Sequence, residues 1–265
     1  MRNPLTWWRH LQTNPVYLRE KGHWGTPNPF YEKLRRFSPF VVIGAVIFGL
    51  CAGSSNPALL NDEMYIFWCF LCLPGILLNG LTMFVTLMAP ALTAPAISTE
   101  VDQGTWEILR VTPMPGRTIM LAKLFGALSR LRIAWPILFA LSLLQGLMWA
   151  CSLTIGGGDF SLLGVPLGLT TVLRPWLEIG FAAMAGLYAS ARMRSATMAL
   201  TASYTAVFLV KLINSSSLWT GVFLLAGGEG FSMMAGILGP TIIYTFIIGG
   251  LIWALFRQAE RLDLG

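Results

Sequence analysis

Cysteine and histidine, the residues that most often build redox and metal sites, occur here in patterns that favour neither chemistry. Cys69 and Cys72 have the CxxC spacing of a redox or metal-binding pair, but they lie inside an apolar run, where cysteine usually acts as a small buried hydrophobe. His10 and His23 lie in a polar leader with no cluster of cysteines or carboxylates beside them. We therefore expect no bound metal ion.

The sequence also lacks the common motifs for binding phosphate and for hydrolysis. No GxxxxGK[ST] loop occurs, and the nearest string, PMPGRT around Gly116, lacks the first glycine and the lysine that would hold a phosphate. No HExxH motif, GxSxG motif or pair of intramembrane aspartates is present. We expect the chain to have no catalytic residues and to bind no cofactor of its own.

The composition indicates the kind of fold that must position the remaining polar residues. Hydrophobic residues make up 55% of the chain and charged residues 11%, and the mean hydropathy of +0.66 is too high for a protein whose surface faces water. We expect one all-α integral membrane domain over residues 38–265. Its six transmembrane helices are expected at about 38–53, 64–92, 118–153, 165–191, 196–212 and 237–256.

Two further elements are expected beside the six crossings. Residues 1–37 form a cytoplasmic leader whose last part predicts an amphipathic helix on the inner leaflet; a basic flank without such a helix is the alternative. Four apolar residues repeat there at helical spacing: Phe30, Tyr31, Leu34 and Phe37. The interrupted apolar segment 214–236, between crossings five and six, predicts a short re-entrant or interfacial element.

The positions of the basic residues predict the orientation of the chain. Sixteen of the 18 Lys and Arg residues lie in segments that are inside if the N-terminus is inside, and the expected outer loops contain none. Because cytoplasmic segments retain Lys and Arg, we expect a multi-pass protein of the cell (inner) membrane with both termini in the cytoplasm. The net charge of +6 then reflects the basic residues retained in cytoplasmic segments, and we expect no nucleic-acid partner.

The expected fourth crossing contains a stripe of small residues and two charges. The small residues recur every four positions: Ala182, Gly186 and Ser190. Such a stripe lets helix backbones approach closely, and a contact within the chain is favoured over one with a second chain. Arg174 and Glu178 lie one turn apart, and we expect them to pair or to reach an outer aqueous cavity. The alternative is a helix that begins only near Pro175, which leaves Arg174 at the interface.

The segment after the second crossing, AISTEVDQGTWEILRVTPMPGRTIMLAKL, predicts a short cytoplasmic helix parallel to the membrane. Ser98 and Thr99 precede three acidic residues, an order that suits a helix start with hydroxyl caps and a favourable dipole. Pro113 and Pro115 end the element, so we expect the helix to run from about Thr99 to Arg110.

The same segment resembles the signature of the type-2 family of ABC transporter permeases. The pattern E-x-x-x-G-T-x-E-x-L-x-x-T-P is filled here by Glu100, Gly104, Thr105, Glu107, Leu109, Thr112 and Pro113. Lys123 and the leader NPVYLRE are also similar to the family, whereas Val101 stands where the family often has arginine. The resemblance covers the topology of the whole chain, but only these two stretches are specific.

The resemblance implies the permease subunit of an ABC exporter in the membrane. In that family two permease chains, identical or homologous, pair around a pathway, and separate ATPase subunits bind ATP and Mg. The short cytoplasmic helix docks on the ATPase, where Glu107 is expected to pair with a basic residue and Gly104 to allow close approach. The alternatives are a structural or assembly subunit of a larger membrane complex and a membrane-embedded lipid-modifying enzyme, for which we find no catalytic constellation.

Overall fold

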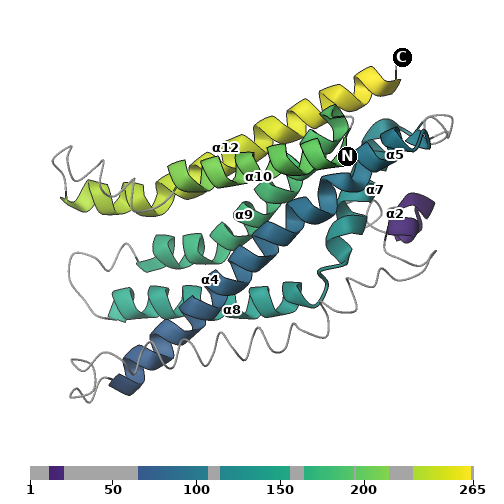
Figure 1. Cartoon of the computed structure of the whole chain (residues 1–265). Coiled ribbons are helices and arrows are strands. Elements are labelled where there is room, and N and C mark those ends of the chain that lie inside the picture. The colour runs from purple at the N-terminus through teal and green to yellow at the C-terminus, as the bar shows by residue number, and fades with distance from the viewer. Residues whose placement is uncertain are drawn as a thin grey trace. The chain divides into compact units, whose positions relative to one another are not determined.

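The computed structural model describes residues 12–20, 65–106, 114–155, 164–193, 195–214 and 229–263, and within these ranges it is helical, with no strand (Figure 1). The helices are α2 (Pro15–Glu20), α4 (Tyr65–Thr93), α5 (Pro95–Asp102), α7 (Gly116–Ser129), α8 (Ala134–Ile155), α9 (Gly164–Arg192), α10 (Ala196–Ile213) and α12 (Glu229–Asp263). The expected crossing at 38–53 and the expected amphipathic helix near 30–37 lie outside the described residues.

Four helical stretches in this part of the chain are long and apolar enough to cross a membrane. They are Pro74–Asp102, Ala134–Cys151, Ala196–Ile213 and Leu238–Glu260. This agrees with the expected class, an all-α membrane protein. The 29-residue helix α9 contains Arg174, Glu178 and Arg192 and is not one of the four.

The single helix expected over 118–153 is wrong, because α7 and α8 are separate helices. The N–H groups of residues 130–132 bond carbonyls three residues back, at 3.0–3.2 Å, in the turn between them. Pro136 lies in the first turn of α8, where its missing N–H leaves no helix hydrogen bond unmade. This favours a new helix start shortly before Pro136, although α9 and α12 accommodate Pro175 and Pro240 in their interiors.

The helix expected over 237–256 is longer than predicted, because α12 covers Glu229–Asp263. The last part of segment 214–236 is therefore helix and not a separate re-entrant element; residues 215–228 lie outside the described ranges. Glycine is common inside membrane helices, so Gly230 and Gly236 do not interrupt α12. Pro240 also lies within α12, and its carbonyl accepts a hydrogen bond from Asn214 Nδ2 at 2.8 Å.

The chain divides into two compact units. Unit 1 comprises Met1–Gly25, Val85–Arg132 and Leu177–Gly265, and unit 2 comprises Thr26–Phe84 and Ile133–Trp176.

In unit 2, α8 and α9 pack through glycine backbones and aromatic rings. A Cβ atom on Gly168 would lie 2.6 Å from the carbonyl oxygen of Gly146 and 2.9 Å from the Cβ of Ala150. Trp135 of α8 stacks on Trp176 of α9, with ring centroids 5.6 Å apart. Such contacts depend on matching shape, because no larger side chain fits between the two helices at the glycines.

In unit 1, the small-residue stripe of α9 lies against the end of α4. A Cβ on Gly186 would lie 3.1 Å from the Cα of Pro90 and 3.3 Å from the nitrogen of Ala94. The close approach predicted for this stripe is confirmed at Gly186, and the contact lies within the chain. Because α9 begins at Gly164, the alternative of a fourth crossing that begins near Pro175 is wrong.

We expect Gly168→Val to lower the stability of the folded chain by about 1–3 kcal/mol, because the branched side chain would overlap the backbone of α8. Thermal unfolding of the purified protein in detergent measures the effect. Gly80→Ala in α4 is the control, because a Cβ there meets no atom within 4 Å; it should be neutral or stabilising by up to ~1 kcal/mol. Equal melting temperatures for Gly168→Val and wild type would contradict the α8–α9 packing.

Candidate functional site

The candidate site is a group of charged side chains where α2, α5 and α7 of unit 1 meet, and the leader sequence itself builds the first of these helices. Asn14 Oδ1 accepts a hydrogen bond from the backbone N–H of Val16 at 2.9 Å, which caps α2, and Pro15 begins the helix. Val16 and Tyr17 are buried in one apolar cluster with Ala122 of α7. The NPVYLRE leader is therefore a short capped helix docked on α7.

The start of α5 differs from the prediction, since the helix covers Pro95–Asp102 and not Thr99–Arg110. Only Ala94 separates α5 from α4, and Ala94 keeps helical dihedral angles (φ −63°, ψ −40°). Ser98 and Thr99 do not cap the helix; their hydroxyls donate to the carbonyls of Ala94 and Pro95, one turn earlier. Serine and threonine commonly make this back-bond inside a helix. The α5 helix thus follows α4 without an intervening loop.

The end of α5 is fixed by Gly104 and Thr105. Gly104 has φ +70°, in the left-handed region that favours glycine, and its N–H bonds the carbonyl of Val101 at 3.2 Å. The hydroxyl of Thr105 donates to the carbonyl of Glu100 at 3.3 Å. A Cβ on Gly104 would meet no atom within 4 Å, so the backbone conformation, and not packing inside the chain, requires glycine here.

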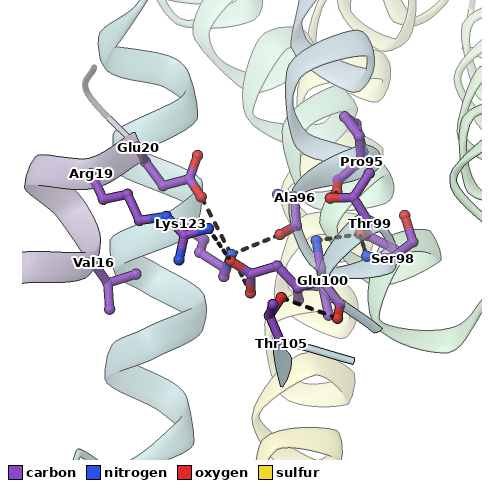
Figure 2. A network of polar contacts seen from close by, with 12 residues as sticks. Val16, Arg19, Glu20, Pro95, Ala96, Ser98, Thr99, Glu100, Thr105 and Lys123 are labelled. Atoms are coloured by element: carbon purple, nitrogen blue, oxygen red, sulfur yellow. Dashed lines mark hydrogen bonds and ion pairs between the residues drawn. The ribbon is translucent and has the colours of Figure 1, made fainter. Parts of the chain in front are cut away.

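Lys123 of α7 lies at the centre of the site, and its side chain is 0% exposed. Figure 2 shows the three oxygen atoms around its ammonium group: Glu100 Oε2 at 2.8 Å, Glu20 Oε1 at 3.3 Å and the carbonyl of Ala96 at 2.7 Å. Lys123 hydrogen-bonds Glu20 and Ala96, and its contact with Glu100 is an ion pair without hydrogen-bond alignment. One cation thus joins α7 to both α2 and α5.

Two arginines complete what we call the Lys123 cluster, which consists of Arg19, Glu20, Glu100, Lys123 and Arg130. Arg19 lies 3.5 Å from Glu100 Oε1, and Arg130 lies 3.5 Å from Glu20 Oε2. Arg130 Nε also donates to the backbone carbonyl of Glu20 at 3.0 Å. Each carboxylate therefore has two basic partners, which offsets the cost of taking it out of water.

The structure describes three of the seven residues that fill the family-like pattern. Glu100 is ion-paired inside the chain, and Gly104 and Thr105 shape the turn after α5. The other four, Glu107, Leu109, Thr112 and Pro113, lie outside the described residues.

Sequence reasoning noted the leader and Lys123 separately and missed that they meet. Arg19, Glu20 and Arg130 were not predicted as site residues. One available signal was that Glu20 is one of only two acidic residues in the basic leader, residues 1–37. A buried cation elsewhere in the chain is a natural partner for such a carboxylate.

Glu178 of α9 has a basic partner that the sequence did not suggest, Lys211 of α10. Lys211 Nζ lies 3.1 Å from Glu178 Oε2, and the carboxylate side chain is 8% exposed. The pair offsets the cost of burying the carboxylate. The pairing of Arg174 with Glu178 stays a prediction. Within the described ranges, no group of three or more His, Cys, Asp or Glu side chains could hold a metal ion.

We expect Lys123→Met to lower stability by about 3–5 kcal/mol, because it leaves Glu100 buried without its nearest cation. Thermal unfolding of the purified chain measures this. Arg19→Gln is the matched control, because Arg19 is 56% exposed and such a pair contributes at most about 1 kcal/mol. Adding Glu100→Gln to Lys123→Met should recover part of the loss. Equal effects of Lys123→Met and Arg19→Gln would show that the cluster does not hold the helices.

Comparison of the chain with protein-family models, with curated proteins and with solved structures gives no match.

Proposed function

We propose that this chain is the transmembrane permease subunit of an ATP-driven exporter and that the tip of α5 docks on a separate ATPase. The observation that supports this is the contrast between the two ends of α5. Near its start, Ala96, Ile97 and Ser98 are buried and the carbonyl of Ala96 accepts a hydrogen bond from Lys123, whereas at its end Val101 is 40% exposed and residues 102–104 are exposed as well. An element that transmits a displacement from a partner protein needs a fixed start and an accessible end.

The attachment of α5 is of the kind needed to carry a displacement into the membrane. At one end α5 follows α4 through Ala94 in helical conformation, and along its side it is ion-paired to α7. A helix fastened in this way moves together with its neighbours as a rigid body. Movement of the ATPase would then be passed to the helices beside α5.

The resemblance of the sequence to type-2 permeases supports the remaining parts of the proposal. The chain crosses the inner membrane six times with both termini in the cytoplasm, and it pairs with an identical or homologous permease chain. ATP and Mg bind to the partner ATPase, which carries out hydrolysis. The exposed apolar Val101 and the polar residues 102–103 fit the tip of α5 to a docking groove with an apolar centre and a polar rim.

Val101→Glu should reduce the amount of ATPase retained on the chain by about tenfold, equivalent to about 1.4 kcal/mol, because a carboxylate would be desolvated at the docked tip. The chain should still fold, because Val101 is exposed. The measurement is quantitative mass spectrometry of the ATP-hydrolysing subunit that co-purifies with the tagged chain from its native membranes.

Arg132→Gln is the control for docking, because Arg132 is exposed on the turn between α7 and α8 and not on α5. It should retain the ATPase as the wild-type chain does. Wild-type retention in Val101→Glu would remove α5 from the docking site. A wild-type preparation without any ATP-hydrolysing subunit would instead favour the structural-subunit alternative.

The orientation predicts which positions a membrane-impermeant maleimide reaches from each side. In a background with the native cysteines replaced by alanine, Gln103→Cys should be labelled only from the cytoplasmic side and Ser161→Cys only from the outer side. Labelling is measured in intact cells and in inverted membrane vesicles. If both positions react from the same side, the six-crossing arrangement is wrong.

A further inference from the structure

We infer that Ser190 of α9 is a positioning residue that joins α5 to the fourth crossing, so that a displacement of α5 is delivered to α9. This inference rests on the proposed function. α5 has no capping side chain of its own at its start. Instead, the Ser190 hydroxyl oxygen accepts hydrogen bonds from the backbone N–H groups of Ile97 at 2.8 Å and Ser98 at 2.9 Å. The cap of α5 thus comes from a residue more than 90 positions away.

The two bonds from Ser190 lie in a dry environment, where they are costly to break. Ser190 is 1% exposed, Ile97 is 2% exposed and Ser98 is 0% exposed. A serine oxygen has two lone pairs, and here each one can accept an N–H. Buried N–H groups that lose their acceptor pay the full cost of desolvation. The start of α5 is therefore fixed in position relative to α9.

One turn before Ser190, close contact between backbones prevents α9 from sliding along the junction of α4 and α5. A Cβ on Gly186 would overlap the hydroxyl of Thr93, and it would lie 3.3 Å from the nitrogen of Ala94. The backbone of α9 thus lies directly against the α4–α5 junction. Because the hydrogen bonds fix direction and the close approach fixes distance, α5 and the last turns of α9 form one rigid part.

The contact of α5 with α10 is of a different kind. Towards α10 the packing is apolar, between Ala94 at the start of α5 and Ala199 of α10, with Ala189 of α9 in the same cluster. Contacts between small apolar side chains have no preferred direction and allow sliding, whereas two hydrogen bonds to one oxygen do not. The residue after Ser190 also fastens α12, since the carbonyl of Ala191 accepts a hydrogen bond from Gln258 Nε2 at 2.7 Å. The geometry therefore favours α9 over α10 as the helix that, together with α4, moves with α5.

Hydrogen–deuterium exchange of the complex with its co-purifying ATPase, with and without ATP and Mg, tests this inference. In the wild-type complex, ATP should change exchange both in a peptide that covers α5 and in one that covers 177–192. Ser190→Ala should keep the ATP-dependent change in α5, because the docking tip is intact, and lose the change in 177–192. Without ATP it should also speed exchange at the amides of Ile97 and Ser98.

Ser203→Ala is the matched control. Ser203 is 1% exposed like Ser190, but its hydroxyl donates to Leu200 within its own helix, at 2.8 Å. This variant should respond to ATP as the wild type does. Ser190→Thr keeps the acceptor oxygen and should restore the change in 177–192. If Ser190→Ala does not fold, Ser190→Cys replaces it, because sulfur preserves the volume while accepting hydrogen bonds only weakly.

The outcomes separate this inference from the proposed function. An ATP-dependent change in 177–192 that persists in Ser190→Ala, or that disappears equally in Ser203→Ala, overturns the role of Ser190 while the proposed function stands. The same holds if the wild-type complex responds in α5 but not in 177–192. A wild-type chain that retains no ATPase overturns the proposed function itself.

Discussion

A charged ammonium group without contact to water is the constraint on which the packing of α2, α5 and α7 depends. Lys123 is fully buried, and a cation in that position would cost several kcal/mol without counter-charges. α7 can therefore pack against its neighbours only when Glu20 and Glu100 are brought to it. Glu20 comes from a segment 103 residues earlier in the chain, so one side chain organises elements that are distant in sequence.

The same constraint explains why α5 is short and stiff. Lys123 holds it at two points, the carbonyl of Ala96 and the carboxylate of Glu100, so the helix cannot shift along α7. Gly104 then turns the backbone out of the helix only two residues after Asp102. In unit 2, by contrast, the described contacts between α8 and α9 are those of glycine backbones and aromatic rings. The packing of α5 on α7 is therefore fixed by a buried charge, whereas the packing of α8 on α9 depends on complementary shape.

Local signals in the sequence predicted the helices better than their ends. Apolar runs indicated the all-α membrane class, and the stripe around Gly186 indicated a close helix contact, which the structure contains. The start of α5 was misjudged because the hydroxyls of Ser98 and Thr99, which look like caps, bond backwards inside the helix. Pro136, whose missing N–H suits a first helical turn, was a signal for the break before α8. Pro175 and Pro240 lie inside helices, however, so proline alone does not locate a break.

The candidate site was harder to predict because its bonds join residues far apart in the chain. Glu100 and Lys123 were visible as elements of a familiar pattern. Glu20, an acidic residue in a basic leader, was a signal for a cation elsewhere in the chain, but it did not identify Lys123 as that partner. Ser190 is similar, since a serine in a stripe of small residues suggests packing, and its role as a cap depends on amides 92 and 93 residues away. Such partners are set by the tertiary fold.

The distance between Glu20 and Lys123 also affects how the chain is made. A ribosome that adds about 5–20 residues per second needs roughly 5–20 s to extend the chain from one to the other. During that interval α2 has been synthesised but α7 has not. Yet α7 supplies both the apolar surface on which α2 packs and the cation that pairs with Glu20. The leader must therefore wait undocked while the segments between are inserted into the membrane. Docking of α2 on α7 is for this reason a late event in biogenesis, although α2 is the first described helix to leave the ribosome.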